Sequence, residues 1–370
     1  MPATALARSQ LRQSCHTLYP GWTSPSPAEE FRAMADWCAQ QQIEADRYGS
    51  GALIEEFEAK LASLLGKPAA VFLPSGVMAQ LIAMQIWAER RGLRRFGQHP
   101  TSHLALHEEE AHAALLGLHA VPVGHRLRPL EAKDLAACQQ PLASLIVELP
   151  IRHAGGQLPS WDALQALKAA AAERGLPLHL DGARLWESQP FYARPHAEIV
   201  AGFTSVYVSL YKGIGGLAGA VLAGEADFIA QARLWQRRFG GTLVQQSPYI
   251  VSAALRFDTR LAQMDACYRR AIMLAEGLQG MAGLRINPAT PQTNMCHLYF
   301  DAPAARVLAA RDQIAGSDGH WLLGAVQDAE VPGWSYSELV VGDQLLALPN
   351  EVVLPRFARL LALAQQGENV

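Results

Sequence analysis

Lys212 has the surroundings of a reactive lysine. It lies in SVYVSLYKGIGGLAGAVLAG, directly after an apolar run and at the start of a glycine-rich turn. A lone lysine after a strand is usually solvated, but these glycines leave room for a flat ligand beside the backbone. An amine held in this way can form a Schiff base with an aldehyde. Ser209, three residues earlier, is either a phosphate ligand or a structural serine.

Asp181 is a carboxylate at the end of a second apolar run. It follows LPLHL and precedes GAR. An aspartate in this position can cap the next segment. A carboxylate within ion-pair distance of a protonated ring nitrogen can instead favour the charged form by roughly 1–3 pK units. Asp181 is therefore a candidate for keeping a pyridine ring cationic, so that the ring accepts electrons from a substrate.

The turn Ser75-Gly76-Val77 is a candidate phosphate site. It separates the short run AAVFL from VMAQLIAMQIWAERRG, whose apolar spacing is that of a long helix. Unpaired N–H groups and the positive end of the helix dipole favour a phosphate there. The order of phosphate turn, strand-end Asp181 and Ser-x-x-Lys-Gly fits one doubly wound sheet. Together they predict a pyridoxal 5'-phosphate enzyme in which Lys212 holds the cofactor.

The sequence resembles the threonine aldolases and the related aromatic amino acid β-eliminating lyases, which are fold type I pyridoxal-phosphate enzymes. The resemblance is carried by YGSGALIEEFEAKLASLLGKPAAVFLPSGVMAQ, LPLHLDGARLWE, SLYKGIGGLAGAVLAG and DFIAQARLWQRRFGG, with weaker similarity in RQSCHTL and QTNMCHLYF. It implies a small amino-acid substrate and a homodimer or homotetramer.

The resemblance also implies roles for further residues. A histidine stacks on the cofactor ring in this family, and His103 matches it, with His107 as the competing candidate. His153 in LPIRHAGGQLP matches the family's histidine near the substrate hydroxyl. Arg184 of DGAR matches the arginine that binds the substrate carboxylate, although an arginine in a surface ion pair is the alternative. The expected substrate-binding residues are Ser14, Tyr48, His107 and Arg184.

The implied activity is cleavage of a β-hydroxy-α-amino acid to glycine and an aldehyde, with His153 or a held water taking the hydroxyl proton. If Lys212 instead removes the proton on Cα, the same scaffold gives β-elimination. A non-catalytic cofactor-binding protein is a further alternative. In PGWSYSELVVGDQ, Ser337 and Glu338 stand where the family usually has a second carboxylate-binding arginine. The exact substrate therefore stays open.

Alternating strands and helices must position these residues. Alanine-rich amphipathic stretches such as 161–175 lie between apolar runs, which predicts a mostly parallel α/β sheet with helices on both faces. The resemblance implies seven strands. Glu108, Glu109 and Glu110 are interpreted as the charged start of a helix, with attraction of a cationic substrate as the alternative. The predicted strands of this sheet include 69–73, 103–107, 144–150, 176–181, 205–210 and 219–224.

The pattern of alternating strands and helices changes after about Tyr249. A long helical region, the runs CHLYFD and ELVVGD and a closing helix predict a smaller C-terminal α+β domain. We therefore expect an N-terminal arm at 1–27, a cofactor-binding large domain at 28–249 and a small domain at 250–370. The arm is expected to pack on a neighbouring subunit.

Composition limits the class of protein. Half of the 370 residues are hydrophobic, and the formal net charge is −3. Charges of both signs are scattered, so nucleic acid is not an expected partner. The five cysteines show no metal-ligand spacing and no metal site is expected. The absence of a long apolar run predicts no membrane span. Together these features predict a cytoplasmic protein with reduced thiols.

Overall fold

The computed structural model describes residues 5–19 and 21–366. By packing, the chain divides into two compact units. One unit is made of residues 25–153 and 157–262 and contains the large sheet. The other combines the N-terminal segment up to Ser24 with residues 154–156 and the chain from Gln263 onward.

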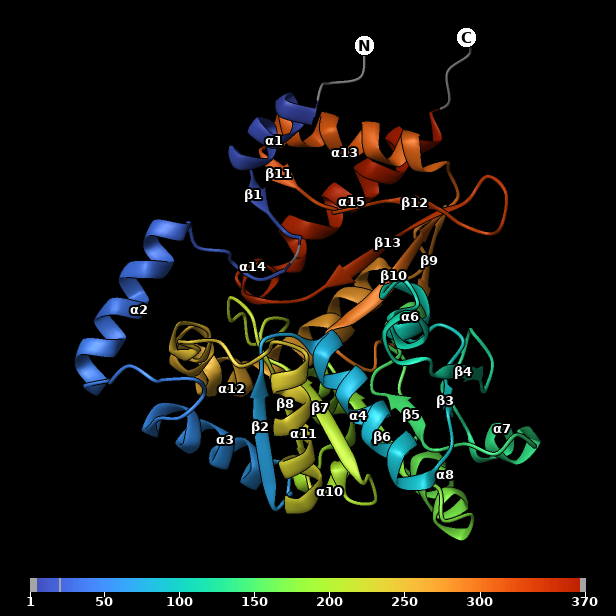
Figure 1. Ribbon diagram of the computed structural model, residues 1–370. Coiled ribbons are helices and arrows are strands. Elements are labelled where there is room, and N and C mark those ends of the chain that lie inside the picture. Colours follow the sequence, from blue (N-terminus) through green and yellow to red (C-terminus); the bar gives the residue numbers. More distant parts are fainter. Residues whose placement is uncertain (1–4, 20, 367–370) are drawn as a thin grey trace. The chain divides into compact units, whose positions relative to one another are not determined.

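The first unit is built on a seven-stranded, mostly parallel sheet of the predicted α/β class (Figure 1). Its strand order is β2-β8-β7-β6-β5-β3-β4, and only β8 runs antiparallel to its neighbours. The strands are β2 (Ala69–Leu73), β3 (Arg95–Gln98), β4 (His119–Pro122), β5 (Leu145–Glu148), β6 (Leu178–Gly182), β7 (Ser205–Ser209) and β8 (Ala220–Gly224).

The central strands are continuous apolar runs because helices cover them. All residues of β6, β7 and β8 are buried. Two of the covering helices, α4 (Gly76–Arg91) and α11 (Ala226–Arg238), pack against each other and against β2 and β8. Their shared core includes Val71, Ile82, Leu222 and Phe228. Parallel strands covered by helices bring their carboxyl ends to one edge, where ligands bind in this class of sheet.

The other helices of this unit connect or flank the strands. The two helices expected before the first strand are present, separated by the turn at 48–51. The long helix α12 (Ser247–Leu278) begins in this unit and ends in the other. The remaining helices are α2 (Pro27–Gln41), α3 (Ala52–Leu64), α5 (His103–Leu106), α6 (Ala111–Leu116), α7 (Ala132–Ala137), α8 (Trp161–Glu173), α9 (Leu185–Tyr192), α10 (His196–Val200) and the 3-10 turn η1 (Arg152–Ala154).

The second unit is the expected smaller α+β body. Its antiparallel sheet has the order β12-β13-β10-β9, and α13 packs against α15. Within this unit, the N-terminal segment pairs with the later chain through His16 and His320. Its contact with a neighbouring subunit stays a prediction. The elements are α1 (Ala5–Gln13), β1 (His16–Thr17), β9 (Leu284–Asn287), β10 (Met295–Phe300), α13 (Ala304–Asp318), β11 (His320–Trp321), β12 (Gln327–Asp328), β13 (Ser335–Val340), α14 (Asp343–Leu346) and α15 (Asn350–Gln365).

One predicted strand is wrong. Residues 103–107 contain the apolar run Leu-Ala-Leu, but they form the short helix α5, which follows Ser102 in the extended conformation of an N-cap. Only Leu104 of α5 is buried, so this short apolar run is not a buried strand. The strand that follows α4 is β3, whose sequence RFGQ carries no apolar run. Within residues 5–19 and 21–366, no helix is long and apolar enough to cross a bilayer.

Candidate active site

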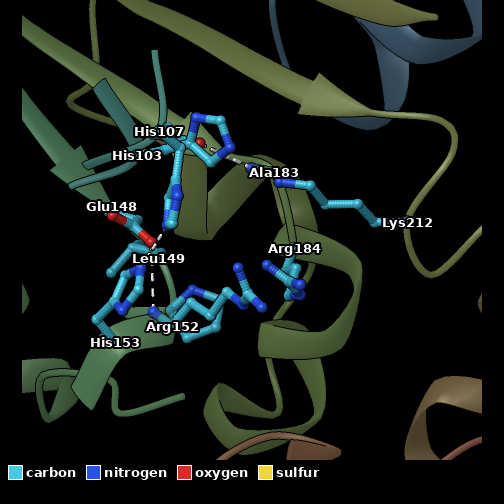
Figure 2. A pocket seen from close by; sticks show the side chains of 11 residues that line it. His103, His107, Glu148, Leu149, Arg152, His153, Ala183, Arg184 and Lys212 are labelled. Atoms are coloured by element: carbon cyan, nitrogen blue, oxygen red, sulfur yellow. Dashed lines mark hydrogen bonds between the residues drawn. The ribbon is translucent and has the colours of Figure 1, made fainter. Parts of the chain in front are cut away.

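A pocket at the carboxyl ends of β5, β6 and β7 brings together the three predicted catalytic residues, His103, His153 and Lys212 (Figure 2). Residues that line it come from the strand ends and the turns that follow them. All of them belong to the first unit. The lining residues are His103, His107, Glu148, Leu149, Pro150, Arg152, His153, Asp181, Ala183, Arg184 and Lys212.

Lys212 lies in the bend after β7, where the glycines that follow allow the chain to turn sharply. Gly215 has a φ of +80°, a left-handed conformation that side chains rarely adopt. Burial lowers the pKa of Lys212, the nearby charge of Arg184 lowers it further, and Asp181 and Glu148 oppose this shift. A lysine with a lowered pKa is neutral more often, and the neutral amine is the nucleophile.

Asp181 and Glu148 face each other across two neighbouring strands. They occupy paired positions in the parallel register of β5 and β6. Oδ1 of Asp181 accepts a hydrogen bond from the amide of Ala183 at 3.1 Å. Burial raises the pKa of Asp181, and the charge of Lys212 opposes that shift. Burial and the charge of Asp181 raise the pKa of Glu148 to about 8.

Three histidines form a row along one side of the pocket. Nε2 of His107 lies 2.7 Å from Nε2 of His153, which is a hydrogen bond between two imidazoles. The rings of His103 and His107 are 5.1 Å apart between centroids. Nδ1 of His103 lies 2.9 Å from Oε1 of the buried Glu108, which fixes the orientation of that ring. Burial and the charges of His103, Arg152 and Lys212 lower the pKa of His107.

Glu108 therefore differs from the other two residues of the acidic run. It is buried and bonded to His103, whereas Glu109 and Glu110 are exposed and have positive φ angles of 46° and 54°. The helix α6 begins only at Ala111, with Glu110 as its N-cap residue but without a side-chain cap hydrogen bond. The interpretation of this run as a helix start thus holds for position 110 alone.

Two arginines also line the pocket. Arg184 lies directly after β6 and was predicted from the DGAR sequence, whereas Arg152 in η1 was not predicted. In Figure 2 their guanidinium groups extend toward one another. Two guanidinium groups in one pocket are suited to binding a carboxylate, because each guanidinium can donate a pair of hydrogen bonds to it.

The predicted phosphate turn has the geometry of a helix N-terminus. Ser75 is the N-cap of α4, and its hydroxyl accepts a hydrogen bond from the amide of Met78 at 3.2 Å. A Cβ on Gly76 would lie 2.1 Å from Oη of Tyr207, so only glycine fits there. The amides of Gly76 and Val77 open the helix, where no preceding turn pairs with them. Ser209 ends β7, and its Oγ accepts a hydrogen bond from the amide of Tyr211 at 3.3 Å.

Two predicted substrate-binding residues lie outside this pocket. Tyr48 is exposed and lines a separate cavity of about 320 Å³ in the first unit, together with Gln246. Ser14 belongs to the second unit, and its hydroxyl donates a hydrogen bond to the carbonyl of Leu11 at 2.8 Å. The roles of both residues remain predictions.

Glu148 and Arg152 are pocket residues that sequence reasoning missed. Glu148 had a usable signal, because it ends the apolar run LIV just as Asp181 ends LHL. Arg152 had no such signal in the sequence, because its position in the pocket depends on the path of the turn after β5. Across the part of the chain that the structure describes, no group of three or more histidine, cysteine, aspartate or glutamate residues is arranged to hold a metal ion.

Comparison with known proteins gives a consistent result. The family model described as "Beta-eliminating lyase" matches residues 24–301. Low-specificity L-threonine aldolase 1 of Arabidopsis thaliana is 28% identical over 280 residues, covering 73% of this chain and 78% of the relative. Low specificity L-threonine aldolase of Escherichia coli K12 is 27% identical over 254 residues, covering 67% and 75% of the two chains.

Solved structures extend the similarity over almost the whole chain. A protein of Listeria monocytogenes EGD-E, described provisionally as an L-allo-threonine aldolase, is 38% identical with a TM-score of 0.89. The match covers 95% of this chain and 98% of that protein. Threonine aldolase of Leishmania major is 18% identical with a TM-score of 0.71, which shows the shared fold alone.

Proposed function

The chain belongs to the β-eliminating lyase family, and on this premise we propose that it holds pyridoxal 5'-phosphate on Lys212 and cleaves a β-hydroxy-α-amino acid to glycine and an aldehyde. The enzyme is a threonine-aldolase-like lyase. The observation that carries the proposal is the single pocket lined by Lys212, Asp181, Arg184 and three histidines.

The residues present fit this cofactor. Lys212 offers an amine of lowered pKa, and Asp181 offers a buried acid that would hold a proton on a ring nitrogen. The N-terminus of α4 offers amides to a phosphate, and Tyr207 against Gly76 leaves no room for a side chain at that turn. When bound, the cofactor supplies an electron-accepting ring for the electron pair released at Cα of the substrate.

Arg184 would bind the substrate carboxylate. Its guanidinium lines the pocket close enough to Lys212 for its charge to lower the lysine's pKa. A forked pair of hydrogen bonds to the carboxylate fixes how the substrate is turned about Cα. That orientation decides which bond at Cα is broken.

The His107–His153 pair would take the proton from the substrate hydroxyl. Because the two Nε2 atoms share one hydrogen bond, at least one imidazole must be neutral and able to accept a proton. As the proton leaves the β-hydroxyl oxygen, a carbonyl forms on Cβ and the Cα–Cβ bond breaks, which releases the aldehyde. A proton added to Cα then completes glycine.

β-Elimination is the second candidate reaction, because the lowered pKa of Lys212 also suits removal of the proton on Cα. The two reactions give different products. We expect the purified protein, loaded with pyridoxal 5'-phosphate, to release glycine and acetaldehyde from threonine or allo-threonine. Release of ammonia and a 2-oxoacid from serine or threonine, without an aldehyde, would favour β-elimination instead.

Covalent attachment is tested at the lysine itself. Borohydride treatment of the loaded wild-type protein should fix the cofactor on the peptide that contains Lys212, as measured by mass spectrometry. Lys212→Ala should fold normally but show no fixed adduct, because the amine is absent. Lys133→Ala, which changes an exposed lysine beside Glu131, serves as the control. An adduct on another lysine in the wild type would contradict the assignment.

A further inference from the structure

Glu148 is a carboxyl group of the pocket that the proposed reaction does not use. It is the last residue of β5 and lines the same pocket as Asp181 and Lys212. Its Oε1 accepts a hydrogen bond from the amide of Arg152 at 3.3 Å. Its Oε2 is buried and has no hydrogen-bond partner among the described residues. A buried carboxyl oxygen without a partner is costly, so this atom requires an explanation.

Glu148, which carries this unpartnered oxygen, neighbours a second acid on the next strand. Glu148 and Asp181 are paired in the register of β5 and β6, and neighbouring strands lie about 4.8 Å apart. Burial opposes ionisation of both acids, and the charge of Asp181 opposes ionisation of Glu148. One of them keeps a proton.

Their surroundings decide which acid keeps the proton. Asp181 accepts the amide hydrogen bond of Ala183, which stabilises its charged form, and Lys212 is the largest source of opposite charge acting on it. Glu148 also accepts an amide hydrogen bond, from Arg152, but burial and the charge of Asp181 raise its pKa to about 8, and that hydrogen bond, Lys212 and Arg184 oppose the shift only in part. Near neutral pH, the proton therefore resides on Glu148.

We propose that Glu148 is the neutral hydrogen-bond donor of this site: its Oε2 keeps a proton and would donate a hydrogen bond to the phenolic oxygen of a bound pyridine ring, while Asp181 keeps the negative charge. The inference rests on the proposed function and deepens it. It makes Glu148 a positioning residue that stabilises the ionised form of the ring oxygen, in the same way that other neutral carboxyl donors act on oxyanions.

Two variants separate the hydrogen bond from the charge. Glu148→Gln keeps a donor of the same shape and cannot ionise, whereas Glu148→Met removes the donor. We expect the pH-dependent absorbance transition of the bound cofactor to be the same in the wild type and Glu148→Gln. In Glu148→Met it should move upward by about one pH unit, the tenfold effect of one hydrogen bond. Equal shifts in both variants, or no shift in either, would overturn the proposal.

The stability of the cofactor-free protein gives a second readout. The folded pKa of about 8 lies above the ordinary value of 4.5 for a glutamate. The folded state therefore binds more protons between these values, and the unfolding free energy should fall as pH rises from about 4.5 to about 8. The charges with the largest effect on Glu148 are those of Asp181, Lys212 and Arg184. The other titratable or charged residues of the same pocket are His103, His107, Arg152 and His153.

Glu148→Gln should reduce this decline, because the amide has no proton to lose. Glu173→Gln, a change at an exposed glutamate on α8, should leave the decline unchanged. A Glu148→Gln protein with the full wild-type decline would overturn the inference. A wild-type protein that stays colourless with added pyridoxal 5'-phosphate would instead overturn the proposed function, while the stability profile would still report the proton on Glu148.

Discussion

At the scale of single residues, the histidine row decides whether the pocket can accept a proton from a hydroxyl group. His153 lines the pocket beside Arg152 in the chain, and its Nε2 is hydrogen-bonded to Nε2 of His107. We predict that His153→Ala lowers kcat for aldehyde release by about 10²–10⁴-fold, the usual contribution of a general base. The absorbance of the bound cofactor should not change. His119→Ala, an exposed histidine on β4, is the matched control and should retain wild-type aldehyde release.

The charge of Arg152 gives a prediction about pH. Arg152 is one of the positive groups that lower the pKa of His107, after burial and the charge of His103. In Arg152→Gln the pKa of His107 should rise, so the imidazole becomes protonated at higher pH and no longer accepts a proton. The acid limb of the kcat/KM profile should therefore move to higher pH. Arg152→Lys keeps the charge and should leave the limb in place; a shift in that variant as well would point to geometry rather than charge.

At the scale of elements, the N-terminus of α4 is held by the contact between Gly76 and Tyr207. A methyl group at position 76 would lie 2.1 Å from Oη of that tyrosine. Gly76→Ala should therefore destabilise the protein by about 1–3 kcal/mol, as overpacking does, and weaken cofactor binding. Adding Tyr207→Phe removes the clashing oxygen and should recover part of both losses. Thermal unfolding and cofactor titration measure the two effects, and equal losses in the single and double variants would refute this account.

The elements also show why some of the fold was predictable. The runs that became β2, β5, β6, β7 and β8 are apolar and are bounded by turns, so their type could be read from the sequence. The short strand β3 begins with Arg95 and contains Gly97, and its pairing depends on its neighbours rather than on its own residues. The stretch 103–107 has an apolar run like those of the strands, but it forms the short helix α5 instead.

The candidate site was predictable to a similar extent. Lys212 and Asp181 could be found because each follows an apolar run, and Arg184 through the DGAR motif. The pairing of Glu148 with Asp181 arises only from the register between β5 and β6. The meeting of His107 with His153 depends on the turn after β5, which contains a cis peptide bond between Leu149 and Pro150. Contacts of this kind join residues distant in sequence and leave no local pattern.

At the scale of the whole molecule, the pocket residues all belong to the first unit, so a bound ligand stabilises that unit directly. A ligand that binds only the folded state stabilises it by about 2.7 kcal/mol at a concentration one hundred times its Kd. A domain of this size gains roughly 2–4 °C in Tm for each kcal/mol. We therefore predict that saturating pyridoxal 5'-phosphate raises the Tm of the wild-type protein by about 5–10 °C.

Lys212→Ala should show less than half of that rise at the same cofactor concentration, because the covalent bond is lost and only the contacts of Asp181 and the α4 N-terminus remain. Differential scanning calorimetry over a range of cofactor concentrations measures both proteins. An equal rise in wild type and Lys212→Ala would mean that the lysine does not hold the cofactor. No rise in either protein would mean that pyridoxal 5'-phosphate does not bind the folded protein, since a ligand bound only to the folded state must raise its Tm.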